Sequence, residues 1–132
     1  MRDPMKLRIT PAAEDLAVAT YQATRLFPNE ERYGLIAQMR SAAVSIGSNI
    51  SEGCGVSGDR AFIPFLHHAL ASASELEFQA RLSIRLKFGD GGELTALLER
   101  IRDIKRQLTR LIIRLRERVA ADRRNANASH RR

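Results

Sequence analysis

A helical stretch at residues 36–53 constrains the fold most, because it has two unlike faces. Apolar side chains recur every three or four residues, which predicts a seam against a core, at Ile36, Met39, Ala43, Ile46 and Ile50. The opposite side, here called the serine face, carries short polar side chains and one carboxylate: Ser41, Ser45, Ser48, Asn49 and Glu52. Long charged side chains usually cover a solvent-facing side, whereas hydroxyl groups let another backbone approach closely. We therefore expect this helix to pack on both sides, with the serine face in a subunit interface.

Apolar periodicity predicts an all-α protein, an antiparallel up-down-up-down four-helix bundle in one domain of residues 1–121. The expected helices are 11–25, 30–52, 60–87 and 93–121, separated by short turns rich in Gly, Pro and Asn. Thr10 and Asn29 are the expected N-caps of the first two helices. Residues 122–132 have no apolar residue larger than Ala, which predicts a disordered basic tail.

The bulk composition bounds the class of protein. A chain of 132 residues can bury one core, and 44% apolar content without Trp suits an Ala/Leu/Ile-rich bundle. The single cysteine, Cys54, excludes an intrachain disulfide and fits a reducing compartment. The sequence contains neither an apolar run of membrane-spanning length nor a signal-peptide core near residue 1. The expected location is therefore the cytoplasm.

Positive charge is concentrated late in the chain. The net charge is +7, yet residues 1–92 carry no net charge. Arginines recur every four residues along the fourth expected helix and continue in the tail, at Arg102, Arg106, Arg110, Arg114, Arg118, Arg123 and Arg124. Such a field favours a polyanion, so these seven are the predicted nucleic-acid contacts. Acidic neighbours leave a salt-bridged solvent face as the alternative interpretation.

Two motifs point to structure rather than chemistry. Gly53, Gly55 and Gly58 match a dinucleotide-binding spacing, but a helix and not a strand precedes them, so we interpret them as a helix end and turn. His67 and His68 are adjacent and point about 100° apart on a helix, which disfavours a shared metal ion. No metal, cofactor or catalytic residue is expected.

The string Ala43-Val-Ser-Ile, followed by Ser48-Asn-Ile and Glu52-Gly53, resembles a bacterial protein family. Its members are the four-helix-bundle proteins encoded in 23S rRNA intervening sequences, which are related to the accessory variability protein of diversity-generating retroelements. The resemblance covers roughly residues 7–119, although Gly47 stands where the family usually has Pro. It implies a small cytoplasmic homopentamer, and for the retroelement relatives it implies binding to nucleic acid and a reverse transcriptase. It also singles out Asn49, Glu52, Glu75 and Glu77.

These observations predict a non-enzymatic, oligomeric accessory or scaffold protein that binds the phosphate backbone of RNA or DNA without reading its sequence. Two alternatives remain open. One is a protein-interaction module that docks an acidic or polymerase-like partner through the same basic surface. The other is an enzyme with a site near Glu52 at a subunit junction, which would need a pocket holding a carboxylate of raised pKa.

Overall fold

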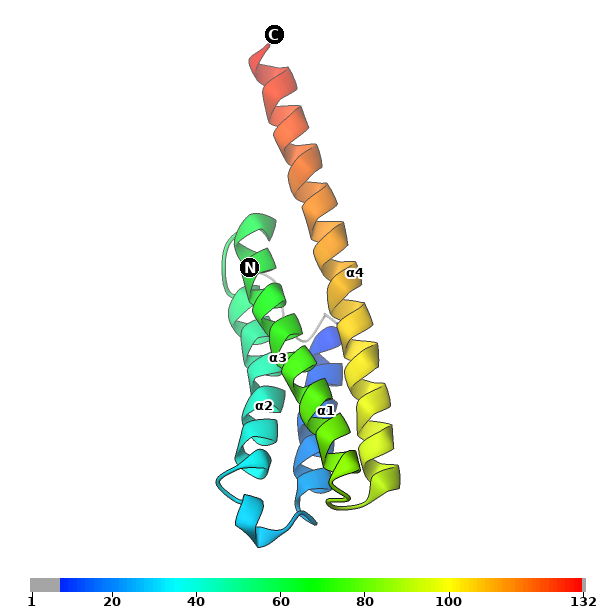
Figure 1. Ribbon diagram of the computed structural model, residues 1–132. Coiled ribbons are helices and arrows are strands. Elements are labelled where there is room, and N and C mark those ends of the chain that lie inside the picture. The colour runs from blue at the N-terminus through cyan, green and yellow to red at the C-terminus, as the bar shows by residue number, and fades with distance from the viewer. Residues whose placement is uncertain (1–7, 132) are drawn as a thin grey trace.

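The computed structural model describes residues 8–131 and confirms an all-helical bundle. Its elements are α1 (Ile9–Thr24), the short 3-10 helix η2 (Asn29–Glu31), α2 (Leu35–Cys54), α3 (Asp59–Arg85) and α4 (Gly91–His130). Each helix packs against the next along the chain, and α1 closes the bundle against α4 (Figure 1). Figure 1 also shows α4 running far beyond the ends of the other helices.

The core follows the predicted apolar seams. Met39, Ala43, Ile46 and Ile50 of α2 are fully buried, and α4 buries eight side chains along one side: Leu94, Leu97, Leu98, Ile101, Ile104, Leu108, Ile112 and Leu115. On α4 the buried position shifts from the expected Leu111 to Ile112, and Leu111 is half-buried. A straight helix has 3.6 residues per turn, so a strict seven-residue repeat drifts around it until the next residue replaces the expected one.

The second helix starts later than residue 30. Asn29–Glu31 forms a 3-10 turn, and α2 begins only after Gly34. There the Glu31 carboxylate accepts a hydrogen bond from the backbone N–H of Leu35 at 3.1 Å, which satisfies one free donor of the new helix. Neither expected cap is present, because α1 begins at Ile9 with Thr10 buried in its first turn, and the side chain of Asn29 caps no helix.

The fourth helix ends later than the expected residue 121, and the described part of the expected disordered tail has a helical conformation. α4 is helical through His130, and its residues after Ala121 are exposed on all sides. The missing apolar seam led to the expectation of disorder. However, helical hydrogen bonds are internal to the segment, and residues 120–131 are mainly Ala, Arg and Asn with no Gly or Pro to stop them.

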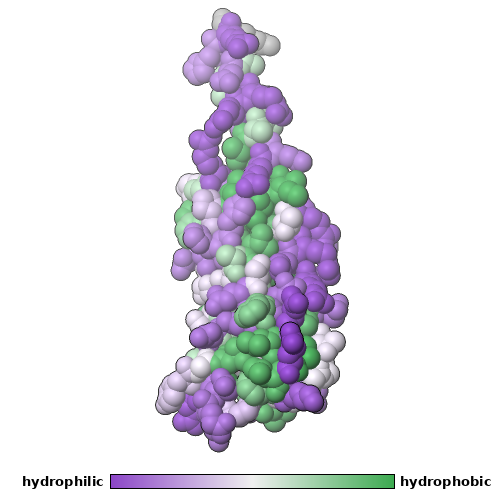
Figure 2. All heavy atoms as spheres, viewed as in Figure 1, coloured by the Kyte–Doolittle hydropathy of each residue, from purple (hydrophilic) through white to green (hydrophobic). Residues whose placement is uncertain are grey.

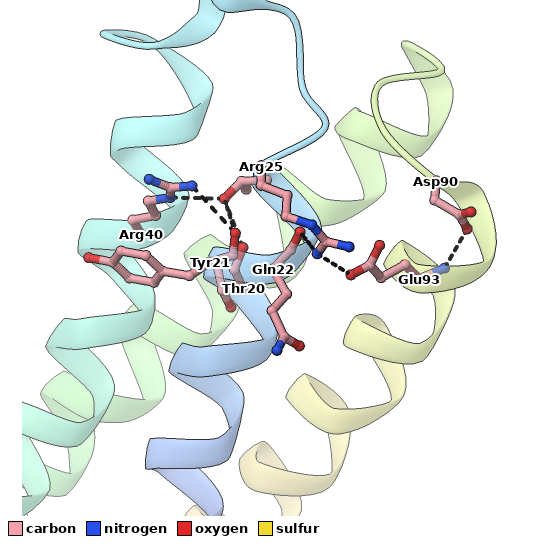
Figure 3. Close-up of polar contacts among 8 residues, drawn as sticks. Thr20, Tyr21, Gln22, Arg25, Arg40, Asp90 and Glu93 are labelled. Atoms are coloured by element: carbon pink, nitrogen blue, oxygen red, sulfur yellow. Dashed lines mark hydrogen bonds and ion pairs between the residues drawn. The ribbon is translucent and has the colours of Figure 1, made fainter.

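The end of α1 is tied to both neighbouring helices (Figure 3). On one side, Arg40 of α2 donates a hydrogen bond through Nε to Thr24 Oγ1 at 2.9 Å. On the other, Arg25 forms an ion pair with Glu93 in the first turn of α4, with 3.2 Å between nitrogen and oxygen. Asp90 caps α4 by accepting from the Glu93 N–H at 2.9 Å. Of these contacts, the Arg25–Glu93 ion pair joins α1 to α4, the two helices that line an open groove on the surface.

Candidate nucleic-acid interface

Three of the seven predicted nucleic-acid contacts are paired within the chain. Arg102 lies 3.0 Å from a Glu77 carboxylate oxygen of α3, and Arg106 lies 3.4 Å from Asp103 one turn earlier. Arg118 approaches Asp59, at the start of α3, through two nitrogens at 3.0 and 3.3 Å. These arginines contribute less free positive charge than their i+4 spacing suggests.

Glu77 of α3 pairs with cations near the start of the arginine row on α4. Its carboxylate binds Lys105 Nζ at 2.8 Å as well as Arg102, so one residue of α3 holds two cations of α4. The hydrogen bond from Lys105 is the main cause of a lowered pKa at Glu77; the Arg102 hydrogen bond and both positive charges act in the same direction, against burial. The family resemblance drew attention to Glu77, and the structure gives it a packing role between α3 and α4.

Arg110 and Arg114 lie in a different environment. They line an open groove of about 640 Å³ between α1 and α4, together with Arg8, and neither forms an ion pair with any residue in the range 8–131. We call this the arginine groove; its remaining lining residues are Ile9, Ala12, Asp103, Gln107 and Leu111. Asp103 is its one carboxylate among the described residues, and Arg106 already engages it. The groove is therefore a concave surface with excess positive charge.

Sequence reasoning missed Arg8. It precedes the first apolar repeat, so no helical spacing connects it to the arginines of α4. Only the antiparallel closure of α1 against α4 brings it beside Arg110 and Arg114.

Arg123 and Arg124 lie on the part of α4 that extends beyond the bundle. We call residues 120–131 the arm. Its hydrophilic side chains cover the narrow upper end of the molecule in Figure 2. Arg124, Asn127, Ala128 and Arg131 line one shallow hollow, so their side chains share one side of the helix.

The serine face divides into two parts. Ser45 exchanges a hydrogen bond with Ser72 of α3 at 2.9 Å, and Asn49 donates to the Ser45 carbonyl at 2.9 Å, so these two residues serve packing within one chain. Ser41, Ser48 and Glu52 are exposed. These three exposed residues are the part of the serine face that is open to another molecule, and Ser41 also lines a hollow with Ser72 and Glu75 of α3.

The glycine and histidine motifs have structural roles in the fold. Gly53 is buried at the α2–α3 contact, and Gly58 has the positive φ of +82° at the turn between these helices. His67 lies 2.9 Å from Arg116, whereas His68 is exposed elsewhere on α3. Within residues 8–131, His, Cys, Asp and Glu form no group of three that could hold a metal ion, and no helix there is long and apolar enough to cross a membrane.

Comparison with known proteins identifies the family. The model of the 23S rRNA-intervening sequence protein family matches residues 5–110. The chain belongs to this family. A similar solved structure is a protein of unknown function from Bacteroides thetaiotaomicron, assigned to the S23 ribosomal protein family. The two share 24% sequence identity with a TM-score of 0.72, over 79% of this chain and 97% of that one. No curated protein matches the chain.

The family match and the basic surface overlap only in part. The 23S rRNA-intervening sequence protein model ends at residue 110, so it includes Arg110 but neither Arg114 nor the arm. At 24% identity the Bacteroides structure supports the shared bundle fold alone. A role for the basic surface therefore rests on this chain's own residues.

Proposed function

We propose that this member of the 23S rRNA-intervening sequence protein family is a non-enzymatic, cytoplasmic, oligomeric accessory protein that binds nucleic acid. The observation that carries the proposal is the arginine groove, where Arg8, Arg110 and Arg114 converge without an ion-pair partner among the described residues. Three guanidinium groups on a concave surface suit the evenly spaced phosphates of a nucleic-acid backbone.

The groove supports backbone binding rather than base stacking. Its lining contains no aromatic side chain, so it lacks the stacking platform on which proteins bind unpaired bases. Contacts between arginine and phosphate release counterions and carry no sequence information. Binding through this groove is therefore salt-dependent and tolerant of sequence.

Self-association is the second part of the proposal. Ser41 and Ser48 leave a low, polar strip on α2, and Val44 lies exposed between them. A neighbouring backbone can approach such a strip closely. The family resemblance implies five copies, which would repeat the arginine groove and multiply its attraction for a polyanion.

A second candidate function rests on a different observation. Phe78 on α3 is 64% exposed, and nucleic-acid binding through α4 gives this side chain no role. A protein-interaction module would use such an apolar anchor together with the arginines to dock an acidic or polymerase-like partner, such as the reverse transcriptase that the resemblance implies for retroelement relatives.

The test of nucleic-acid binding compares two neutralised arginine pairs. Arg110→Gln with Arg114→Gln removes the charge of the groove, and Arg81→Gln with Arg85→Gln removes the same charge from exposed positions on α3. Anisotropy titrations on 30-base-pair RNA and DNA duplexes at several salt concentrations measure the dependence of log K on log salt. The groove variant is expected to reduce the slope by about 2, at roughly 0.9 per lost phosphate contact, and the α3 variant to leave it unchanged.

Two results contradict the proposal of nucleic-acid binding. One is no binding of the unchanged protein at about 50 mM salt, where such contacts are strongest. The other is an equal salt slope for both variants. A defined complex with an acidic protein, formed while nucleic-acid binding is weak and unsaturable, supports the second candidate instead.

The test of self-association is sedimentation velocity at tens of micromolar protein. Ser41→Arg with Ser48→Arg places two bulky cations on the exposed part of the serine face and is expected to shift the protein to monomers. Ser57→Arg with Ser74→Arg adds the same bulk and charge at exposed sites outside the serine face and is expected to leave the assembly intact. A monomeric unchanged protein contradicts this part of the proposal.

A further inference from the structure

Within residues 8–131, no other helix packs against the arm beyond its base, where Arg123 and Arg124 share a shallow hollow with Ile63 of α3. Figure 1 shows α4 leaving the bundle as a single rod, and every residue from Asp122 to Arg131 is exposed. At 1.5 Å per residue, the helical part from 120 to 130 is about 16 Å long. Isolated helices of this length are only marginally stable in water. A partner surface that binds the arm would stabilise its helix.

The arm's side chains are short or cationic. Arg124, Asn127 and Arg131 share one side, where they line the same hollow. Arg123 precedes Arg124 by about 100° around the helix, and the only acid, Asp122, lies about 160° from Arg124 on the far side. Between the arginines the arm carries Ala, Asn and Ser, so its backbone can approach a partner closely.

One partner fits both the shape and the charge. The major groove of B-form DNA is about 12 Å wide and admits an α-helix. Phosphates border it on both sides, and base edges form its floor. The major groove of A-form RNA is too deep and narrow to receive a helix. An arm with a slim helical body and arginines at its sides matches the DNA groove and not the RNA groove.

We propose that the arm inserts into the major groove of duplex DNA, with Arg123, Arg124 and Arg131 on the flanking phosphates and Asn127 facing base edges. An asparagine amide can donate to and accept from adenine in this groove. This inference rests on the proposed nucleic-acid binding and names its substrate class. The arginine groove alone would accept either duplex, whereas the arm selects DNA.

The experiment separates the helical shape of the arm from its charge. Ala126→Pro keeps every arginine but breaks the helix within the arm. Ala126→Ser is the matched control, since it keeps both the charge and the helix. Ala126 is exposed and outside the core, so both variants are expected to retain the bundle and its melting temperature.

Three duplexes of one mixed sequence serve as probes at about 50 mM salt. They are plain DNA, DNA whose cytosines are replaced by glucosylated 5-hydroxymethylcytosine, and RNA. The glucose groups fill the major groove and leave the phosphates in place. The unchanged protein and Ala126→Ser are expected to bind plain DNA about tenfold tighter than either other duplex, a difference of about 1.4 kcal/mol. Ala126→Pro is expected to bind all three equally.

The outcomes distinguish this inference from the function on which it rests. If the unchanged protein binds none of the duplexes, both the proposed nucleic-acid binding and the insertion of the arm into the DNA major groove are contradicted. If binding depends on Arg110 and Arg114 but is equal on plain and glucosylated DNA, the proposed function stands and the inference is overturned. Equal binding of plain DNA by Ala126→Pro and Ala126→Ser overturns it as well, because the arginines would then act without a helix.

Discussion

Gly53 of α2 lies directly against the ring of Phe62 on α3. A Cβ atom at Gly53 would come within 2.6 Å of Phe62 Cδ1 and 2.8 Å of Phe65 Cβ, closer than atoms can pack. Phe62 is fully buried, so any shift of its ring would have to displace other core side chains. The absence of a side chain at Gly53 is thus what lets α2 and α3 approach at this end of the bundle.

Gly53→Ala is therefore expected to destabilise the protein by about 2 kcal/mol, the usual cost of overpacking a core. Gly47→Ala is the matched control, since its Cβ would meet only Ala13 Cβ at an ordinary 3.8 Å. Alanine favours a helix interior over glycine, so Gly47→Ala is expected to stabilise by roughly 0.5–1 kcal/mol. Urea unfolding measures both, and shifts of the same sign would contradict this account of the contact.

Arg40 joins α2 to α1 by two kinds of interaction. Its Cζ lies 4.6 Å from the centre of the Tyr21 ring, and its Nε donates to Thr24 Oγ1 at 2.9 Å. Arg40→Met keeps the apolar stem and removes both, with an expected loss of about 1–2 kcal/mol in the free energy of unfolding. Arg40→Lys keeps a cation but lacks the planar guanidinium group, so its stability is expected to lie between that of Arg40→Met and that of the unchanged protein. Thermal unfolding of the two variants gives the comparison; a stability of Arg40→Met equal to that of the unchanged protein would contradict the prediction.

The bundle could be predicted from the sequence because apolar residues recur along each helix with a regular spacing. Buried side chains at intervals of three and four set the helices and their inner faces without any knowledge of the partner helix. The start of α2 depends on the local break at Gly34 and on a hydrogen bond from Leu35 to Glu31, which apolar spacing does not encode. The end of α4 was missed because that helix continues without a core to face.

The candidate site was predictable only in part. The arginine row is visible in the sequence, and so is Asp103 three residues before Arg106, but the acids that pair with Arg102 and Arg118 come from α3. Glu77 meets Arg102 and Asp59 meets Arg118 only after α3 and α4 pack together. Arg8 joins the groove through the closure of α1 on α4, a contact between residues about a hundred positions apart.

Asp90 caps α4, the longest helix. Its carboxylate accepts from the Glu93 N–H at 2.9 Å, so Asp90→Ala is expected to cost about 1 kcal/mol. Asp90→Asn keeps a side-chain oxygen at the same place and is expected to retain most of that stability. Urea unfolding at neutral pH compares them, and an equal loss in the two variants would show that the charge of Asp90, rather than its capping oxygen, stabilises the helix.

Glu77 makes the stability of the α3–α4 pair depend on pH. The hydrogen bond from Lys105 is the largest cause of a lowered pKa at Glu77 in the folded protein, below its ordinary value of 4.5. The hydrogen bond from Arg102 and the positive charges of both residues lower this pKa further. A group whose pKa is lowered by folding stabilises the protein above its unfolded pKa, and this contribution is lost as the pH falls through the folded pKa. Glu77 is 20% exposed and Arg102 44%, so solvent screens the pair and the contribution at pH 7 is about 1 kcal/mol.

Glu77→Gln is accordingly expected to be about 1 kcal/mol less stable than the unchanged protein at pH 7, with the gap closing as the pH is lowered from about 5 toward 3. Glu99→Gln is the control, because Glu99 is 70% exposed and 3.8 Å from Arg102, so its removal should change stability by only a few tenths of a kcal/mol at any pH. Urea unfolding across this range measures the gap. If the gap between Glu77→Gln and the unchanged protein does not narrow anywhere as the pH falls below about 5, the cost of the substitution reflects the shape of the side chain and not its charge.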